Sequence, residues 1–167
     1  LPASQEGRKK KFEEDVETWK AEVERIDKGC VNGEAIWAAP DFNDAAWKSM
    51  KVPGLMQEQD LPGFSGLVWF RKTIDIPAGW AGKDLILNLG VIDDNDFTYF
   101  NGIQIGHTEG WMAPRSYKIP KELVKKGKAV IAVRVMDTGG TGGINGSPES
   151  ISLHLSDTEA IQLAGNW

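Results

Sequence analysis

The spacing of apolar residues changes near residue 30, and the first part of the chain has the spacing of a helix. Between residues 5 and 28, large apolar side chains recur at intervals of four and three positions, at Phe12, Val16, Trp19, Val23 and Ile26. This spacing is typical of a helix with a single apolar stripe. Ser4 can cap its first turn, and Gly29 can end it as a residue in left-handed conformation. We predict an amphipathic helix whose stripe packs either on the rest of the chain or on a domain outside it.

After residue 30 the apolar positions alternate with polar ones, as in half-buried strands. One predicted buried face consists of Leu85, Leu87, Leu89 and Val91, and another of Ile131, Val133 and Val135. Turn residues rich in Gly and Pro separate the candidate strands, which are 67–76, 84–91, 96–101, 102–106, 116–119, 129–137, 150–155 and 160–163.

Many short strands without intervening helices indicate an all-β sandwich or barrel. We therefore divide the chain into an N-terminal helix, residues 1–30, and a β-sandwich domain, residues 31–167. The stretch 37–66 is rich in Pro, Gly and Asp, and we expect it to wrap the edge of the sandwich with Trp47 and Leu55 as anchors.

Asn101-Gly102 predicts a tight hairpin, because a type I′ turn needs positive φ at both central residues. A two-residue turn there pairs Phe100 with Ile103 and Thr98 with Ile105, so that these four side chains share one face.

Charge and composition exclude several classes of partner. The 167-residue chain has a formal net charge of −5, which argues against binding to nucleic acid or to anionic membranes. No apolar run approaches the roughly 20 residues of a membrane span. Cys30 is the only cysteine, so no disulfide forms within the chain. Because the sequence starts at Leu1 without Met or a leader, we expect a piece of a longer protein.

No enzyme motif can be assembled from the sequence, and we predict no catalytic residues. Gly63-Phe64-Ser65-Gly66 is not the G-x-S-x-G of a nucleophile elbow. The two histidines, His107 and His154, have no evident nucleophile and orienting acid. The glycine run at 139–146 lacks G-K-[ST] and leads into Pro148 rather than a helix, which argues against phosphate binding.

The loop Gly110 to Arg115 is the best candidate for ligand recognition. Trp111 can stack on a sugar ring, and Arg115 can bind a carboxylate with two hydrogen bonds. Arg115 can equally pair with one of the acids at 93–96 and hold the loop in place.

The acidic residues near this loop allow two interpretations. Asp137 lies at the end of a strand with its side chain on the apolar face, so it needs partners. Backbone N–H groups of the glycine run can supply them, or ligand hydroxyls or a cation can. Asp93, Asp94 and Asp96 can likewise cap a loop or hold a structural calcium ion, although they do not match an EF-hand. We expect no cofactor, with calcium as the alternative.

Four segments together resemble a known family. They are Val68 to Lys72, Ile92 to Gly106 with its I-D-D-x-D-x-x-Y-x-N-G-x-x-x-G pattern, Trp111 to Pro120 with W-x-x-P-R-x-Y-x-I-P, and Val130 to Gly140. This order resembles the β-sandwich domain inserted into sialate O-acetylesterases, over roughly residues 34–167. More broadly it is similar to the galactose-binding-like jelly roll of family-two glycoside hydrolases.

The resemblance implies a galactose-binding-domain-like jelly roll whose host hydrolyses O-acetyl esters of sialic acid in a catalytic domain outside this chain. The domain would support or shape that catalytic domain and could contact glycan through Trp111, Arg115, Asp137, Asp94 and Asp96. The resemblance also implies a periplasmic or secreted protein. The alternatives are a carbohydrate-binding module of a glycoside hydrolase and a structural spacer.

Overall fold

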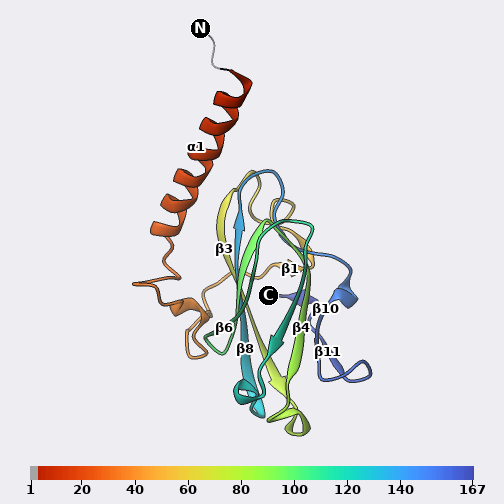
Figure 1. The fold of residues 1–167 in the computed structure, drawn as a ribbon. Coiled ribbons are helices and arrows are strands. Elements are labelled where there is room, and N and C mark those ends of the chain that lie inside the picture. The colour runs from red at the N-terminus through yellow and green to blue at the C-terminus, as the bar shows by residue number, and fades with distance from the viewer. Residues whose placement is uncertain (1–3) are drawn as a thin grey trace.

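The computed structural model describes residues 4–167, which form a β-sandwich preceded by one long helix (Figure 1). One sheet has four strands in the order β3-β8-β5-β6. These strands are β3 (Gly66–Ile76), β8 (Gly127–Asp137), β5 (Asn95–Phe100) and β6 (Ile103–Thr108). All of their pairings are antiparallel.

The second sheet has six strands and packs across the first. Its order is β11-β10-β4-β9-β2, with β7 also paired to β4. The strands are β2 (Gly54–Leu55), β4 (Leu85–Asp93), β7 (Pro114–Ile119), β9 (Gly143–Asn145), β10 (Ile151–His154) and β11 (Ala160–Gln162). A separate pair joins β1 (Lys51–Val52) to β12 (Gly165–Asn166). The predicted all-β sandwich with an N-terminal helix is confirmed.

The core lies between the two sheets and contains the predicted apolar faces of β4 and β8. Leu85, Leu87 and Leu89 are buried against Ile131, Val133 and Val135. Burial of aliphatic side chains of this size contributes about 1.5–3 kcal/mol each, so this layer is the main source of the stability of the sandwich.

The prediction that Val91 belongs to the buried face of β4 is wrong. Val91 is only half-buried, and Ile92 is buried in its place. The register between β4 and β7 shifts between Asn88 and Val91, and Gly90 within this irregularity has φ +62°. A β-bulge adds one residue to one strand, which moves the following side chains to the opposite face.

The hairpin between β5 and β6 has the predicted turn but only part of the predicted register. Asn101 and Gly102 have φ of 48° and 82°, and Phe100 pairs with Ile103. Thr98, however, pairs with Gly106 instead of Ile105. A Cβ atom at position 106 would lie 2.2 Å from the ring of Tyr117. The bulge therefore places a glycine where the tyrosine ring needs the space.

The N-terminal helix α1 (Gln5–Arg25) begins as predicted, since Ser4 Oγ accepts a hydrogen bond from the Gly7 amide at 3.1 Å. It ends before residue 28, and Gly29 is not its C′ residue. Gly29 is instead packed beneath Trp69, where a Cβ atom would lie 2.4 Å from Trp69 Nε1.

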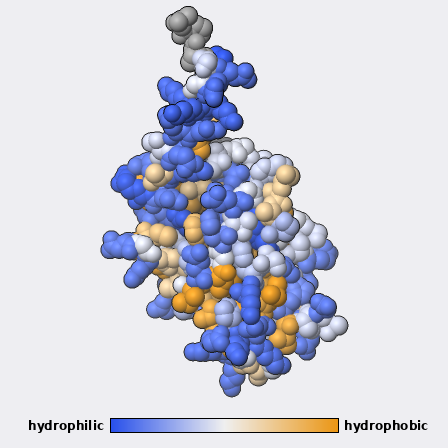
Figure 2. Space-filling view, in the orientation of Figure 1, coloured by the Kyte–Doolittle hydropathy of each residue, from blue (hydrophilic) through white to orange (hydrophobic). Residues whose placement is uncertain are grey.

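The helix extends away from the sandwich (Figure 1), and only the middle of its apolar stripe is partly covered. Val16, Trp19 and Val23 are half-buried, whereas Phe12 is 68% and Ile26 is 58% exposed. No residue of α1 is fully buried, and the projecting part is mainly hydrophilic on the face seen in Figure 2. No helix in the part of the chain that the structure describes is long and apolar enough to cross a membrane.

A buried carboxylate joins the end of the helix to the outer face of the four-stranded sheet. Asp27 accepts hydrogen bonds from Arg134 Nε at 2.7 Å and from Trp69 Nε1 at 3.0 Å. The Gly29 amide donates to the same carboxylate at 2.8 Å. Trp69 and Arg134 are cross-strand partners on β3 and β8. The sheet register therefore places both donors side by side, where one Asp27 carboxylate can accept from both.

Candidate functional site

The loop predicted to bind ligand is closed around Arg115. This side chain is 1% exposed, and its Nε donates to Asp96 Oδ1 at 2.8 Å. Its two terminal nitrogens donate to backbone carbonyls of the surrounding loops, those of Asp94, Thr108, Gly110 and Ala113. Each of the five N–H groups of the guanidinium thus has a protein acceptor. This geometry fits the interpretation that Arg115 holds the loop in place.

Asp96 is equally enclosed and accepts from three side chains. Besides Arg115, Thr98 Oγ1 donates to it at 2.7 Å and the Tyr117 hydroxyl at 2.9 Å. Burial, together with the neighbouring Asp96 carboxylate, raises the pKa of Tyr117, so the phenol stays protonated and keeps donating. Tyr117 was not among the predicted site residues, although it is in the same sequence motif as Arg115.

Trp111 is 57% exposed and its neighbour Met112 is 69% exposed. The structure therefore puts Trp111 at the surface and Arg115 in the interior, and the two do not offer one shared ligand surface. Ligand contact by these residues stays a prediction.

The acidic residues near the glycine run are held mainly by protein groups. Asp137 is buried and accepts from the Gly139 amide at 2.9 Å and from Gln57 Nε2 at 2.7 Å. Burial raises the pKa of Asp137. This arrangement fits the interpretation that loop backbone satisfies the carboxylate, with Gln57 as a partner that the sequence did not reveal.

Asp93 and Asp94 are neighbours with opposite pKa shifts. Burial raises the pKa of Asp93 to about 6, and hydrogen bonding and repulsion from Asp94 add to this. For Asp94, burial acts upward, but hydrogen bonds from Thr138 outweigh it and lower the pKa. Among residues 4–167, no group of three or more His, Cys, Asp or Glu side chains is arranged to hold a metal ion.

One hydroxyl contacts a histidine in a way the sequence analysis overlooked. Ser152 Oγ lies 2.8 Å from His154 Nε2 on the same strand. Ser152 is 1% exposed, and the other ring nitrogen of His154 faces the Ser156 carbonyl at 3.4 Å rather than a carboxylate. A nucleophile needs access to substrate and an oriented base, and this pair has neither.

A hollow in the described part of the chain runs along β3. It is a cavity of about 640 Å³, which we call the β3 groove. All seven residues from Leu67 to Thr73 line it. Because alternate side chains of a strand point to opposite faces, a cavity that touches every residue in a row must run along the edge of the strand. β3 is an edge strand, paired only with β8.

One wall of the β3 groove is aromatic. Trp47 packs edge-on against Trp37 at 5.1 Å and lies 5.5 Å from Phe42. Trp37 in turn packs edge-on against Trp69 at 6.2 Å. Trp37 and Trp47 are half-buried, so this cluster holds partly exposed rings in fixed positions. The predicted anchoring role of Trp47 agrees with these contacts.

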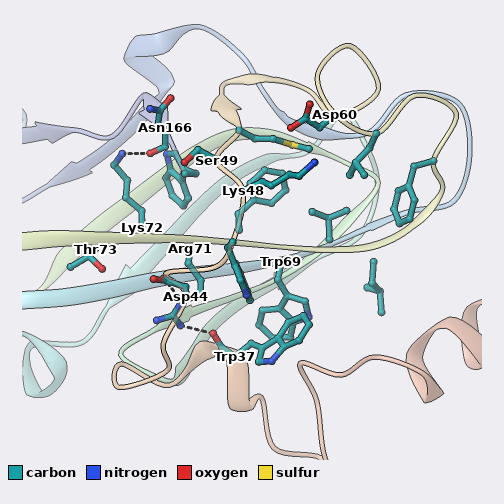
Figure 3. Close-up of a pocket in the computed structure, with 18 residues that line it drawn as sticks. Trp37, Asp44, Lys48, Ser49, Asp60, Trp69, Arg71, Lys72, Thr73 and Asn166 are labelled. Atoms are coloured by element: carbon teal, nitrogen blue, oxygen red, sulfur yellow. Dashed lines mark hydrogen bonds and ion pairs between the residues drawn. The ribbon is translucent and has the colours of Figure 1, made fainter.

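Arg71 holds the same wall in place, and Figure 3 shows its guanidinium beside Asp44 and Trp37. Its Nε donates to Asp44 Oδ2 at 2.8 Å, and its other nitrogens donate to the carbonyls of Trp37, Ala39 and Phe42. The groove is also lined by Met50, Asp60, Leu61, Phe64, Asn166 and Trp167, and Figure 3 shows Asp60 and Asn166 on the other side of β3 from Asp44 and Trp37. Lys72 crosses toward this side and donates to the Asn166 carbonyl at 2.8 Å (Figure 3).

The sequence contained a weak signal for this groove. The chain has seven tryptophans, a high number for 167 residues. Three of them, Trp37, Trp47 and Trp167, lie outside the strands predicted to form the core. Sequence spacing could not bring residues 37–50, 60–73 and 166–167 together, because their proximity depends on how the wrapping segment closes and on the β1–β12 pair. Neither β1 nor β12 has an apolar repeat, since each has only two residues.

Comparisons with known proteins place the fold among sugar hydrolases. No protein-family model matches the sequence. Over 68% of this chain, the structure is similar to Bacteroides uniformis β-glucuronidase, with a TM-score of 0.58, 25% identity and coverage of 15% of that enzyme. A second similarity is to Bacteroides uniformis β-glucuronidase 2, with a TM-score of 0.56 and 24% identity over 64% of this chain and 14% of that one.

A third similarity, to Faecalibacterium prausnitzii β-glucuronidase, has a TM-score of 0.52 and 22% identity over 58% of this chain and 17% of that one. The chain thus corresponds to about a sixth or less of these enzymes' length. The matches agree with the broader resemblance to family-two glycoside hydrolases. They provide no support for the narrower resemblance to sialate O-acetylesterases.

Proposed function

We propose that this chain is a non-catalytic β-sandwich domain that works within a larger carbohydrate-active hydrolase, with a glycoside hydrolase as the host that the comparisons favour. The observation that carries the proposal is the likeness to Bacteroides uniformis β-glucuronidase, which extends over 68% of this chain but only 15% of the enzyme. The partner of the domain would then be a catalytic domain of the same protein.

The side chains of the described residues support a non-catalytic role. The Ser152 hydroxyl that contacts His154 is buried, and the other ring nitrogen of His154 faces the Ser156 carbonyl rather than an orienting acid. Asp96 and Arg115 are hydrogen-bonded to each other, and Arg115 also donates to backbone carbonyls of the surrounding loops. This arrangement stabilises the loop, and neither the Asp96 carboxylate nor the Arg115 guanidinium is in contact with solvent.

A sialate O-acetylesterase is the second candidate host, and the motif from Ile92 to Tyr117 favours it. The residues that carry the motif fill one structural unit, because Arg115 and Tyr117 both donate hydrogen bonds to Asp96. A periplasmic or secreted location belongs to this proposal.

The coding sequence on either side of residues 1 and 167, together with turnover by the whole protein, tests the proposal. We expect the host to hydrolyse a chromogenic glucuronide, or an O-acetylated sialoside if the second candidate is right. A barrel domain downstream indicates the glycosidase, and a Gly-Gln-Ser-Asn block upstream indicates the esterase. The 167-residue chain alone should turn over neither substrate. Turnover by this chain that Ser152→Ala abolishes would overturn the non-catalytic role.

A further inference from the structure

We propose that the β3 groove is a binding site for an acidic saccharide, a pyranose that carries a carboxylate. The inference deepens the proposed function by giving the domain a ligand class and a place to hold it. It moves the sugar contact from the loop of Trp111 and Arg115 to a different part of the sandwich.

The size and the aromatic wall of the groove suit a sugar ring. A volume of about 640 Å³ lies within the roughly 300–1,000 Å³ of small-molecule sites. Trp47 is held from behind by Trp37 and Phe42, so stacking a pyranose on its partly exposed ring would order no additional side chain. A rigid aromatic surface lowers the entropic cost of binding.

The floor of the groove offers hydrogen-bonding groups of both kinds. Along its outer edge, β3 makes no backbone hydrogen bond within residues 4–167 beyond its ladder with β8. The edge of a strand presents alternating N–H donors and C=O acceptors. Sugar hydroxyls both donate and accept, so this floor complements them better than it complements an apolar molecule.

The charges in the groove favour an anionic sugar over a neutral one. Of the two carboxylates that line the groove, Asp44 is already paired with Arg71. Lys72 uses one of its three N–H donors on the Asn166 carbonyl, and the exposed Lys48 lines the same cavity. Asp60 is an exposed carboxylate on the opposite side. The groove is therefore lined by two ammonium groups, those of Lys48 and Lys72, and by one carboxylate without a bound cation, that of Asp60.

An NMR titration of the ¹⁵N-labelled 167-residue chain tests this site with three probes: glucuronic acid, N-acetylneuraminic acid and galactose. We expect backbone shifts at residues 67–73 and indole shifts of Trp47 at sugar concentrations of about 1–10 mM, with galactose about tenfold weaker. The two acidic probes distinguish a uronate from a sialate as the preferred ligand.

Three variants locate the binding. Lys72→Gln should weaken the acidic sugars about fivefold to tenfold while changing galactose little, which a merely structural role of Lys72 would not do. Ser49→Trp fills the exposed rim without touching the core and should abolish binding. Trp111→Ala is the matched control, and its binding should equal that of the unmodified chain.

Several results would overturn the site. They are equal binding of galactose and the acids, shifts confined to residues 107–115, loss of binding in Trp111→Ala, or no shift with any probe at about 50 mM, a concentration beyond ordinary weak affinity. Each of these can occur while the flanking sequence still encodes a hydrolase, so failure of the site is distinct from failure of the proposed function.

Discussion

The loop around Arg115 and the β3 groove contain the same kinds of side chain but use them in opposite ways. Both combine tryptophan, arginine and aspartate. In the loop, Arg115 and Asp96 are fully buried as a pair, and the tryptophan is at the surface without them. In the groove, Arg71 is buried but its partner Asp44 keeps 40% of its side chain exposed, and the tryptophans line an open cavity.

The difference teaches that residue type in a motif does not reveal whether a polar group is available. An arginine has five donors, and a loop with enough carbonyls can occupy all of them. The motif around Asp96 is dense in unusual residues because a buried ion pair needs many partners at once. Such density indicates a demanding structural unit as readily as a binding site.

The largest expected effect on stability is at the buried ion pair of Arg115 and Asp96. Arg115→Met leaves Asp96 as a buried carboxylate without its cation, and we expect a loss of about 3–5 kcal/mol in the free energy of unfolding. Urea denaturation followed by tryptophan fluorescence measures it. The double variant Arg115→Met/Asp96→Asn should recover part of the loss. A loss below about 1 kcal/mol in the free energy of unfolding would mean that solvent reaches Arg115, and the loop would again be a candidate binding site.

The corresponding change in the groove should cost less. Arg71→Met removes the cation from Asp44, whose carboxylate water can still reach, but it strands the Trp37 and Ala39 carbonyls. We expect a loss of about 1–3 kcal/mol, together with a change in tryptophan emission as the aromatic wall loosens. If Arg71→Met lowers the free energy of unfolding as much as Arg115→Met does, the contrast between the partly exposed Arg71–Asp44 pair and the buried Arg115–Asp96 pair does not hold.

A pH dependence should come from Asp93, near the closed loop. Its folded pKa of about 6 lies above the ordinary value of 3.8, so the folded chain keeps a proton that the unfolded chain has already released. Asp93 therefore lowers the free energy of unfolding as pH rises from about 4 through 6. Asp94, with its lowered pKa, acts in the opposite direction.

Replacing Asp93 with Asn should remove this penalty and stabilise the chain at neutral pH relative to acid pH. Because Asp93 is only half-buried and water screens it, we expect a gain below about 1 kcal/mol. Urea midpoints at pH 4.5 and 7.5 for both chains measure it. A variant that loses stability at pH 7.5 would show that the Asp93 carboxylate has a favourable partner.

The smallest effect is expected at the exposed tryptophan of the loop. Trp111→Ala removes a side chain that is 57% exposed, and surface substitutions of this kind usually change stability by less than about 0.5 kcal/mol. Thermal denaturation is sufficient to check it. A larger loss would show that Trp111 packs on the protein and is not available to a ligand.

Regular alternation made most of the fold predictable. The apolar repeats of residues 85–89 and 131–135 and the Asn101-Gly102 turn led to the right strands, because period and turn chemistry are local properties. Bulges at Gly90 and Ile105 were not predictable, since each is set by a neighbour distant in sequence, Asn145 or Tyr117. The same holds for the bonds of Asp27 with Arg134 and of Asp137 with Gln57.

The site was less predictable than the fold for a related reason. Arg115, Asp96 and Asp137 were singled out from the sequence as candidate ligand-binding residues, but only the three-dimensional arrangement shows which protein groups they bind. The β3 groove depends on three separated segments meeting beside an edge strand, and no spacing in the sequence encodes that meeting.

Helix α1 gives the molecule a mechanical asymmetry. Its 21 residues correspond to about 30 Å of length at 1.5 Å per residue, and the bonds of Asp27 lie at its root. Such a rod is a lever: a small sideways load at its far tip becomes a much larger one at that pivot. A load on the helix would thus reach Arg134 on β8 and Trp69 on β3, the strand that forms the floor of the groove.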